Sequence, residues 1–326
     1  MAHMIDESTG RAAIAYVGRK PWHELGQELT PGASIEEWTR EAGLDYHVKQ
    51  SPVLFETDAM SAMQEWPERK VLHRSDNGVP LAVVSKDYRV VQPAEVMEFF
   101  RRLADIGGFE LETAGALSSG KRVWALARVG PEADIVEGDL VRSYLLVGTS
   151  YDGTMATIAK HTNIRVVCNN TITAAVDHEK DIDLGHIKST VRVLHSERFD
   201  PDAVRLQLGI VKDSFERFIL QARKLAGETM TSAECDVFIR ELLKPYHAGN
   251  LPVEESKAYK RIMGLFSGSA IGSEIPGVTG TRWQALNAVT ELIDHERGRT
   301  ASTRMESAWF GTGNKIKNRA LELLVS

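Results

Sequence analysis

Cysteine is scarce in this sequence: there are two, Cys168 and Cys235, and they lie far apart. Such a pair excludes a disulfide framework and a cysteine-rich zinc site, and it fits a reducing cytoplasm best. Long apolar runs are also missing, since none approaches the roughly 20 residues needed to cross a bilayer. Residues 1–10 are polar and lack the basic and apolar segments of a secretory signal. We therefore expect a cytoplasmic protein with no membrane partner.

An excess of positive charge is missing as well. The chain of 326 residues carries 39 lysines and arginines against 45 aspartates and glutamates, which gives a net charge of −6. Nucleic-acid binding nevertheless depends on a local basic stripe rather than on the sum of charges, so this balance does not exclude it. The remaining composition is ordinary for a folded protein, with 43% hydrophobic and 26% charged residues, enough for a sizeable core.

Motifs for metals and nucleotides are absent too. No pair of histidines has the spacing, with a carboxylate, of a zinc protease. The segment nearest to a phosphate-binding loop, Gly311 to Lys315, lacks both the correct first glycine and the terminal hydroxyl residue. It predicts a turn between two helices, whose exposed backbone N–H groups are able to hold an anion. We expect no metal and no cofactor.

A catalytic nucleophile is conceivable in one place. Cys168, with His161 or His178 as its base, has the residue types of such a site. However, Cys168 ends the apolar segment 164–168, and cysteines in such strands usually behave as small buried hydrophobes. Pairs of neighbouring carboxylates are explained by solvated charge runs. The sequence therefore assigns no catalytic residue.

The middle of the chain is rich in strands. The apolar segment 80–85 predicts a strand, and Pro93 suits the first turn of a helix that ends at about residue 106. A hairpin is expected around Ser118, Ser119 and Gly120. Its strands, and those that continue the sheet, are predicted at 109–114, 122–129, 141–150, 155–159 and 164–167.

The two ends of the chain favour helices. Ser34, with Glu37 three residues later, predicts a short capped helix that precedes an extended segment at 46–55. From Asn170 the pattern changes to helix. A flexible loop is expected at 267–280, which is rich in glycine and serine. Helices of the last third are predicted at 200–227, after a capping box at 231–234, at 283–297 and at 302–325.

Together these patterns predict an α+β protein with an antiparallel β-sheet core flanked by helices and a mostly helical C-terminal third. Three segments are expected: an N-terminal α/β segment at 1–75, the β-sheet core at 76–198 and the helical region at 199–326. The same pattern is also compatible with one continuous domain.

Basic and amide residues are concentrated on the predicted sheet. Alternate positions of a strand share one face, so these side chains are able to form a basic stripe that holds phosphates. Lys188 and Arg192 share a face if their segment is helical, and Asn169 and Asn170 are alternatively suited to fixing a turn. The residues expected to contact nucleic acid are Lys121, Arg122, Arg142, Lys160, Arg165, Asn169, Asn170, Lys188 and Arg192.

Aromatic residues near this stripe are candidates for stacking on bases, as a single-strand binder requires. They are Tyr88, Trp124 and Tyr151. The same pattern also describes an ordinary solvated sheet face with Trp124 in the core. The residues alone leave both interpretations open.

Several separated motifs resemble one known family. The motifs are Pro-Trp-His-Glu-Leu-Gly at 21–26, Tyr-Arg-Val-Val-Gln at 88–92, Ala-Gly-Ala-Leu-Ser-Ser-Gly-Lys-Arg-Val-Trp-Ala-Leu-Ala at 114–127, Arg-Val-Val-Cys-Asn-Asn-Thr at 165–171 and Glu-Ser-Ala-Trp-Phe-Gly-Thr-Gly at 306–313. In this order they resemble the phage- and plasmid-encoded family called domain of unknown function 932, over about residues 15–325. One departure is Glu24, where glycine is expected.

The resemblance has implications for function. The strand-rich middle followed by a helix is similar, remotely, to the core of the Rad-fifty-two-like single-strand annealing proteins. This similarity implies a homo-oligomeric ring that holds single-stranded DNA in a basic groove and anneals complementary strands without ATP in recombination of a phage or plasmid. Trp309 and Phe310 would then pack either between subunits or in the core.

Fold alone does not determine function, so two alternatives stay open. One is a hydrolase or nucleotide-processing enzyme that uses Cys168 or carboxylates. The other is a phage interaction protein that inhibits a host function.

Overall fold

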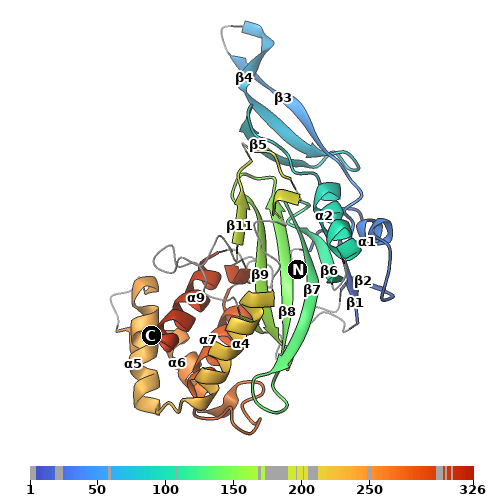
Figure 1. Ribbon diagram of the computed structural model, residues 1–326. Helices are drawn as coiled ribbons and strands as arrows, with labels where there is room; N and C mark the ends of the chain where they lie inside the picture. The colour runs from blue at the N-terminus through green and yellow to red at the C-terminus, as the bar shows by residue number, and fades with distance from the viewer. Residues whose placement is uncertain are drawn as a thin grey trace.

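The computed structural model places two β-sheets beside a group of helices (Figure 1). The α+β class predicted from the sequence is therefore confirmed. The residues that the structure describes are 5–18, 25–57, 60–106, 109–167, 170–172, 190–195, 197–200, 202–204, 212–247, 252–298, 304, 307–309 and 311–326.

The larger sheet forms the centre of the molecule. Among the described residues it has eight strands in the order β10-β9-β8-β7-β6-β1-β2, and β11 pairs with β9 as well. Each described pairing in it is antiparallel except that of β1 with β2. The two short strands predicted at 155–159 and 164–167 form one strand, β9. The strands are β1 (Ile14–Val17), β2 (Gln27–Leu29), β6 (Phe109–Leu117), β7 (Arg122–Asp134), β8 (Leu140–Ser150), β9 (Thr157–Arg165), β10 (Asn170–Ile172) and β11 (Thr190–Val193).

The hairpin between β6 and β7 turns where the sequence predicted it. Ser118, Ser119 and Gly120 adopt φ angles of 54°, 58° and 86°, in the left-handed region that this tight turn requires. Glycine suits the third position because a Cβ there would lie 2.8 Å from Nη1 of Arg74. The Tyr46 hydroxyl donates to the carbonyl of Gly120 at 3.1 Å, which ties the turn to the N-terminal segment.

A smaller sheet extends from one end of the molecule (Figure 1). We call residues 48–85 the arm; its strands are β3 (Val48–Thr57), β4 (Met60–Arg74) and β5 (Pro80–Ser85), with β4 in the centre. The sequence predicted β3 and β5 but not β4. Charged residues and a proline dilute the strand pattern of β4, and its pairing with β3 supplies the order that its own composition does not.

Buried charges anchor the arm at its base. The Arg74 side chain is 1% exposed and forms ion pairs with Asp6 and Asp76. Its guanidinium also lies 4.0 Å from the centre of the Tyr46 ring, in a cation–π arrangement. These contacts hold the end of β4 against the N-terminal segment.

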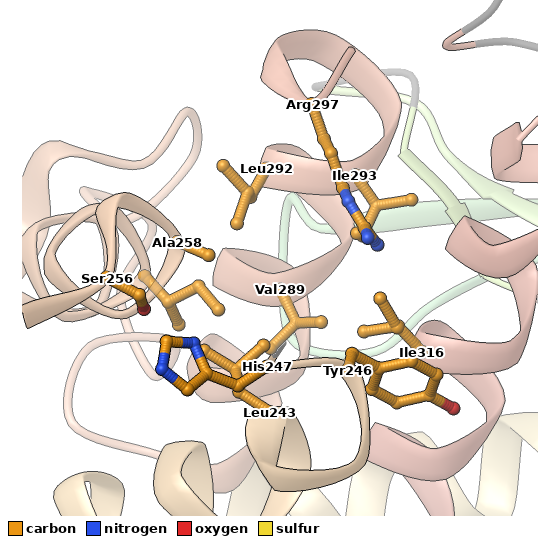
Figure 2. Close-up of a pocket in the computed structure, with 11 residues that line it drawn as sticks. Leu243, Tyr246, His247, Ser256, Ala258, Val289, Leu292, Ile293, Arg297 and Ile316 are labelled. Carbon is orange, nitrogen blue, oxygen red and sulfur yellow. The ribbon is translucent and has the colours of Figure 1, made fainter. Parts of the chain in front are cut away.

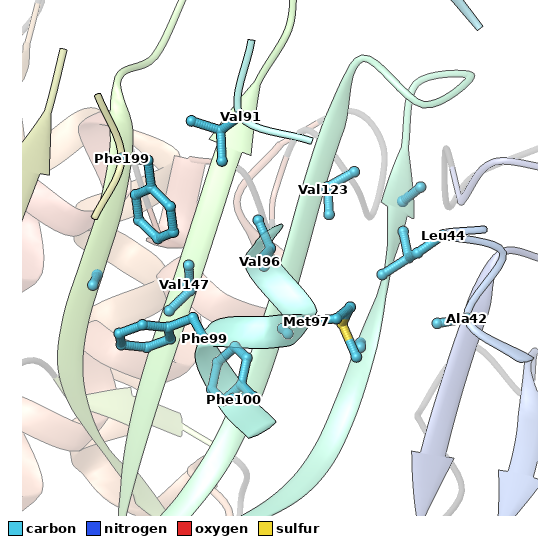
Figure 3. Close-up of a cluster of buried hydrophobic side chains, with 14 of the residues drawn as sticks. Ala42, Leu44, Val91, Val96, Met97, Phe99, Phe100, Val123, Val147 and Phe199 are labelled. Carbon is cyan, nitrogen blue, oxygen red and sulfur yellow. The ribbon is translucent and has the colours of Figure 1, made fainter. Parts of the chain in front are cut away.

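Helices α1 (Ile35–Glu41) and α2 (Pro93–Ile106) cover one face of the large sheet. Figure 3 shows Phe99 and Phe100 of α2 beside Val147 of β8. Burial of side chains of this size contributes about 1.5–3 kcal/mol each. Small residues of the strands leave room for the rings; they are Ala114, Ala116, Ala125, Ala127 and Ala159.

The C-terminal region is mostly helical, as predicted. Its helix α7 contacts β10, and α4 contacts β7. Both predicted helix caps are present: Ser34 accepts from the N–H of Glu37 at the start of α1, and Thr231 and Glu234 form the capping box of α5. The elements are α4 (Lys212–Gly227), α5 (Ser232–Leu243), η1 (Lys244–Tyr246), η2 (Val253–Glu255), α6 (Lys257–Gly264), η3 (Leu265–Ser269), α7 (Arg282–Glu291), η4 (Leu292–Glu296) and α9 (Thr312–Val325).

One buried network connects the sheet to these helices. The Arg165 guanidinium on β9 donates to Asp139 at 2.6 Å and to the carbonyls of Ile271 and Gly272 at 3.0 and 3.1 Å. The indole N–H of Trp283 donates to the other carboxylate oxygen of Asp139 at 2.7 Å. We call Arg165, Asp139 and Trp283 the joint. No member is more than 1% exposed.

Two segments differ from the helix predicted after Asn170. Asn170–Ile172 forms β10 and Thr190–Val193 forms β11, and both pair with β9. Because β9 is buried along nearly its whole length, the N–H and C=O groups at its edge need backbone partners there. The helix prediction is wrong here, and Arg192 lies on a strand.

The segment 267–280 also differs from the flexible loop that was expected. Its hydroxyl side chains bond to backbone carbonyls: Ser273 donates to Gly268 at 2.9 Å, and Thr279 donates to Ser273 at 2.6 Å. Val278 is 1% exposed and packs in the core of the helical region. Side-chain hydrogen bonds and burial therefore hold this glycine-rich segment in a defined set of turns.

Candidate nucleic-acid interface

Strand pairing decides which basic residues share a face of the large sheet. Trp124, Gly148, Ile158 and Arg192 lie directly opposite one another across β7, β8, β9 and β11. Opposite residues of antiparallel strands point to the same side, as do positions two apart on one strand. We call this side the Trp124 face. The predicted basic residues on it are Arg122, Arg142, Lys160 and Arg192.

A polar pocket lies at the rim of the Trp124 face. Its volume is about 270 Å³. Arg122 contributes from the start of β7 and Arg192 from β11, so residues distant in the sequence meet there. We call it the rim pocket. Its lining residues are Arg122, Thr154, Met155, Ala156, Ile158, Arg192 and Gly311.

Arg122 is oriented by the turn that follows β8. Its Nη2 donates to Oγ1 of Thr154 at 3.0 Å and lies 3.4 Å from the Asp152 carboxylate. Burial acts to raise the pKa of Asp152, but hydrogen bonds from Thr154 and the charge of Arg122 outweigh it and hold that pKa below its usual range. Asp152 is therefore ionised at neutral pH and keeps Arg122 in the pocket wall.

Lys160 and the start of α9 lie beside the rim pocket. Lys160 is 5% exposed, and its Nζ donates to Oδ1 of Asn314 at 2.7 Å. Asn314 belongs to the first turn of α9, and Gly311 is the residue that caps this helix. The predicted turn at Gly311–Lys315 therefore opens a helix next to the pocket. Backbone N–H groups at a helix start carry partial positive charge and attract anions.

This arrangement is suited to an oxyanion. Arg122, Arg192 and the neighbouring Lys160 bring three cations to one place, and among the described residues the printed ion pair there is that of Arg122 with Asp152. Guanidinium groups hold phosphate oxygens with paired N–H donors. The chemistry of the rim pocket thus fits a phosphate group held without covalent change.

Arg165 does not belong to this surface. It lies at an odd position of β9, on the side opposite the Trp124 face, and is 1% exposed. Its guanidinium is enclosed in the joint, where Asp139 and two carbonyls bond to it. The expectation that Arg165 contacts phosphate is corrected for this reason.

The other predicted basic and amide residues are dispersed. Lys121 lies half-buried in the hairpin turn before β7, and Asn170 lies on β10. Arg142 is at the other end of the Trp124 face, where it pairs with Glu132 at 2.8 Å. The residues singled out in the sequence that lie outside the described ones are Glu24, Cys168, Asn169, His178, Lys188 and Phe310.

The aromatic residues chosen for base stacking are enclosed. Tyr88 is 9% exposed, its hydroxyl donates to the carbonyl of Ser150 at 2.7 Å, and its ring stacks on His195. Trp124 is 3% exposed and packs edge-on against Trp309, while Tyr151 is 0% exposed. The core interpretation of Trp124 is therefore the right one, and the partly buried Trp309 packs against the same cluster. Bases cannot reach these rings.

Exposed aromatics lie on the arm instead. Phe55 is 44% and Trp66 45% exposed. The guanidinium of Arg69 lies 5.4 Å from the Trp66 ring centre. The sequence analysis missed Trp66 because β4 was not predicted, and Phe55 because nothing in the predicted segment 46–55 marked its side chain as exposed. The signal that could have revealed Trp66 is its setting among Glu65, Pro67 and further charged residues, which is typical of a solvated position.

A buried polar pair lies on the sheet face opposite the Trp124 face. Nε2 of His161 is 2.6 Å from Oγ of Ser143, and His161 is 2% exposed. Burial lowers the pKa of His161 to about 4. The ring is therefore neutral at physiological pH and serves as a hydrogen-bonding group inside the sheet.

None of the described helices is both long and apolar enough to span a membrane.

No curated protein and no solved structure matches the chain. The family model described as Domain of unknown function (DUF932) matches residues 80–318, from β5 into α9, a stretch that includes every lining residue of the rim pocket. Because the match spans more than half of the chain, the protein belongs to the DUF932 family.

Proposed function

We propose that the protein binds single-stranded DNA at the rim pocket and anneals complementary strands without ATP. The observation that carries this proposal is the convergence of Arg122, Arg192, Lys160 and the start of α9 around one pocket. In this proposal Arg122 and Arg192 contact phosphate, while the buried Lys160 adds positive charge and orients Asn314. Phosphate contacts hold a strand without reading its sequence, as annealing requires.

The base of the arm is connected to the rim pocket through His195. Nε2 of His195 is 2.8 Å from the carbonyl oxygen of Met155, which lines the pocket, and its ring stacks on Tyr88 with 4.3 Å between centres. Tyr88 lies three residues after the end of β5. His195 and Tyr88 therefore link a strand bound at the rim pocket to the base of the arm.

The exposed rings of the arm favour a single strand over a duplex. Unpaired bases stack on aromatic side chains, whereas the bases of a duplex are already stacked on each other. Trp66 offers such a surface, with Arg69 over its ring. The proposal therefore assigns phosphate binding to the rim pocket and base stacking to the arm.

Binding to a fluorescent single-stranded oligonucleotide across a salt series tests this proposal. We expect tight binding that weakens steeply as salt rises and that exceeds binding to a duplex of equal length. Each phosphate contact on a single strand adds about 0.7 to the steepness with which the logarithm of the binding constant falls against the logarithm of the salt concentration. Because R122A/R192A removes two such contacts, the variant should reduce this steepness by about 1.4. The matched control is R101A/R102A, two arginines of α2 that do not line the rim pocket.

Three results contradict the proposal at different levels. Absence of binding at low salt rejects DNA as the ligand. Equal slopes for wild type and R122A/R192A reject the rim pocket as the place of contact. Binding without faster annealing of complementary oligonucleotides in nucleotide-free buffer rejects the annealing activity. Light scattering with and without DNA tests the homo-oligomer that this activity implies.

A further inference from the structure

A second pocket lies in the C-terminal helical region and shares no residue with the rim pocket (Figure 2). Its volume is about 180 Å³. A cavity of roughly 150 Å³ with apolar walls is able to hold benzene. We call it the helical pocket. Most of its wall is aliphatic and comes from Leu243, Ile262, Val289, Leu292, Ile293 and Ile316.

One cation projects into this aliphatic space. Arg297 follows the π-helical turn η4, and its backbone N–H donates to the carbonyl of Leu292 at 2.7 Å, which closes the wide turn. Figure 2 shows its side chain reaching from the end of this turn across the pocket, beside Ile293 and toward Ile316. Single π-helical turns are frequent at functional sites.

One donor of the partly buried Arg297 side chain is short of an acceptor. Within the described part of the chain, its Nη1 atom is buried and has no hydrogen-bond partner. Burial also lowers the pKa of Arg297, against the opposing effect of Tyr246. Buried charged donors are costly when they are left without an acceptor, and folded proteins rarely leave them so. The helical pocket is therefore complementary to a negative charge.

We propose that the helical pocket binds a small organic carboxylate with an apolar body about the size of benzene. The carboxylate accepts from Nη1 of Arg297, and the body packs among Val289, Ile293 and Ile316. A neutral hydrocarbon leaves Nη1 of Arg297 without a partner, whereas a small inorganic anion leaves the aliphatic wall uncovered. Both parts of the ligand are thus required. This site stands on its own and does not depend on DNA binding.

Calorimetric titration of the full chain with benzoate and with 4-methylvalerate tests the proposal. We expect saturable binding of at least one of the two. Benzyl alcohol keeps the body of benzoate but lacks its charge, and it should bind about ten-fold more weakly or worse. The variant R297Q should weaken carboxylate binding by a similar factor. R240Q, at an exposed arginine of α5 that does not line the pocket, should bind as wild type does.

A second variant protects the test against a folding defect in R297Q. Ala258 lines the pocket from α6 and is only partly buried, so A258F fills the space while Arg297 is retained. We expect A258F to abolish binding and circular dichroism to show both variants folded. Failure of both carboxylates to saturate at millimolar concentration overturns the proposal. Equal binding by R297Q and wild type, or equal binding of benzoate and benzyl alcohol, does so as well.

Discussion

The joint and the rim pocket place basic side chains of one sheet in two contrasting environments. Arg165 of the joint is 1% exposed and bonds to Asp139 and two backbone carbonyls. Arg192 of the rim pocket lies on the neighbouring strand, is exposed and lines a polar hollow. The alternation of side chains along β9 and the packing of the helices separate the two environments. A count of basic residues on a strand therefore does not locate a binding surface.

The cost of desolvation explains the contrast. A guanidinium removed from water needs nearly all of its donors satisfied by the protein, and the joint provides this. Such an arginine connects parts of the fold and has little capacity left for a ligand. A guanidinium at the rim keeps its hydration and exchanges water for phosphate oxygens when a ligand arrives.

The sharpest test removes the charge from the joint. In R165M, Asp139 keeps its buried carboxylate but loses its cationic partner, so we expect a loss of about 3–5 kcal/mol in the free energy of unfolding. Urea denaturation followed by circular dichroism measures it. R192M, at an exposed position, should change the stability by no more than about 0.5 kcal/mol. Similar losses in both variants would remove the distinction between joint and rim.

Acid stability probes the buried interior on the side of the joint. His161 has a pKa of about 4 in the folded protein, against an ordinary histidine value of 6.5. Above pH 6.5 the ring is neutral in both the folded and the unfolded state and contributes nothing. Between pH 6.5 and 4 only the unfolded chain binds a proton at this histidine. The free energy of unfolding therefore falls by about 3 kcal/mol in total as the pH is lowered through this range. Below pH 4 both states bind the proton, so the contribution of His161 changes no further. Unfolding curves of H161Q at several pH values should lack this decline. If H161Q and the wild type lose stability equally with falling pH, the His161 ring is accessible to protons in the folded protein.

The arm provides a test of how far the binding surface extends beyond the rim. Trp66 is exposed, so W66A should leave stability within about 0.5 kcal/mol. If bases stack on this ring, affinity for single-stranded DNA should fall by about 1–3 kcal/mol with the salt slope unchanged. Fluorescence anisotropy at fixed salt measures the affinity. Wild-type affinity in W66A would confine the binding surface to the rim pocket.

The smallest expected effect comes from reversing one rim charge. R192E should weaken single-strand binding by about five- to ten-fold at low salt, and this difference should shrink as salt screens the charge. R142E is the matched variant, since Arg142 lies at the other end of the Trp124 face. An equal loss in both variants would point to the overall charge rather than to the rim pocket.

Local sequence signals predicted much of the fold. Ser34 and Thr231 predicted their helix starts because a cap depends on residues within one turn. The strand at 80–85 and the turn at Ser118 to Gly120 were equally local. In contrast, β4, β10 and β11 escaped prediction because each is ordered by a partner strand. The helical pocket was also invisible, since its lining residues are distant in the sequence and meet only through packing.

The α+β class, the order of most strands and helices, and the presence of basic residues in the middle of the chain follow from the sequence alone. They depend on hydrophobic periodicity, capping residues and turn residues, which act over a few positions. The tertiary structure decided that Arg165 is buried in the joint, that Trp124 and Tyr151 belong to the core, and that Arg122 and Arg192 meet at one pocket. Register and helix packing sum many contacts between distant residues, and a one-residue change of register exchanges the two faces of a strand. For that reason the residues of the candidate sites were visible in the sequence, but their accessibility was not.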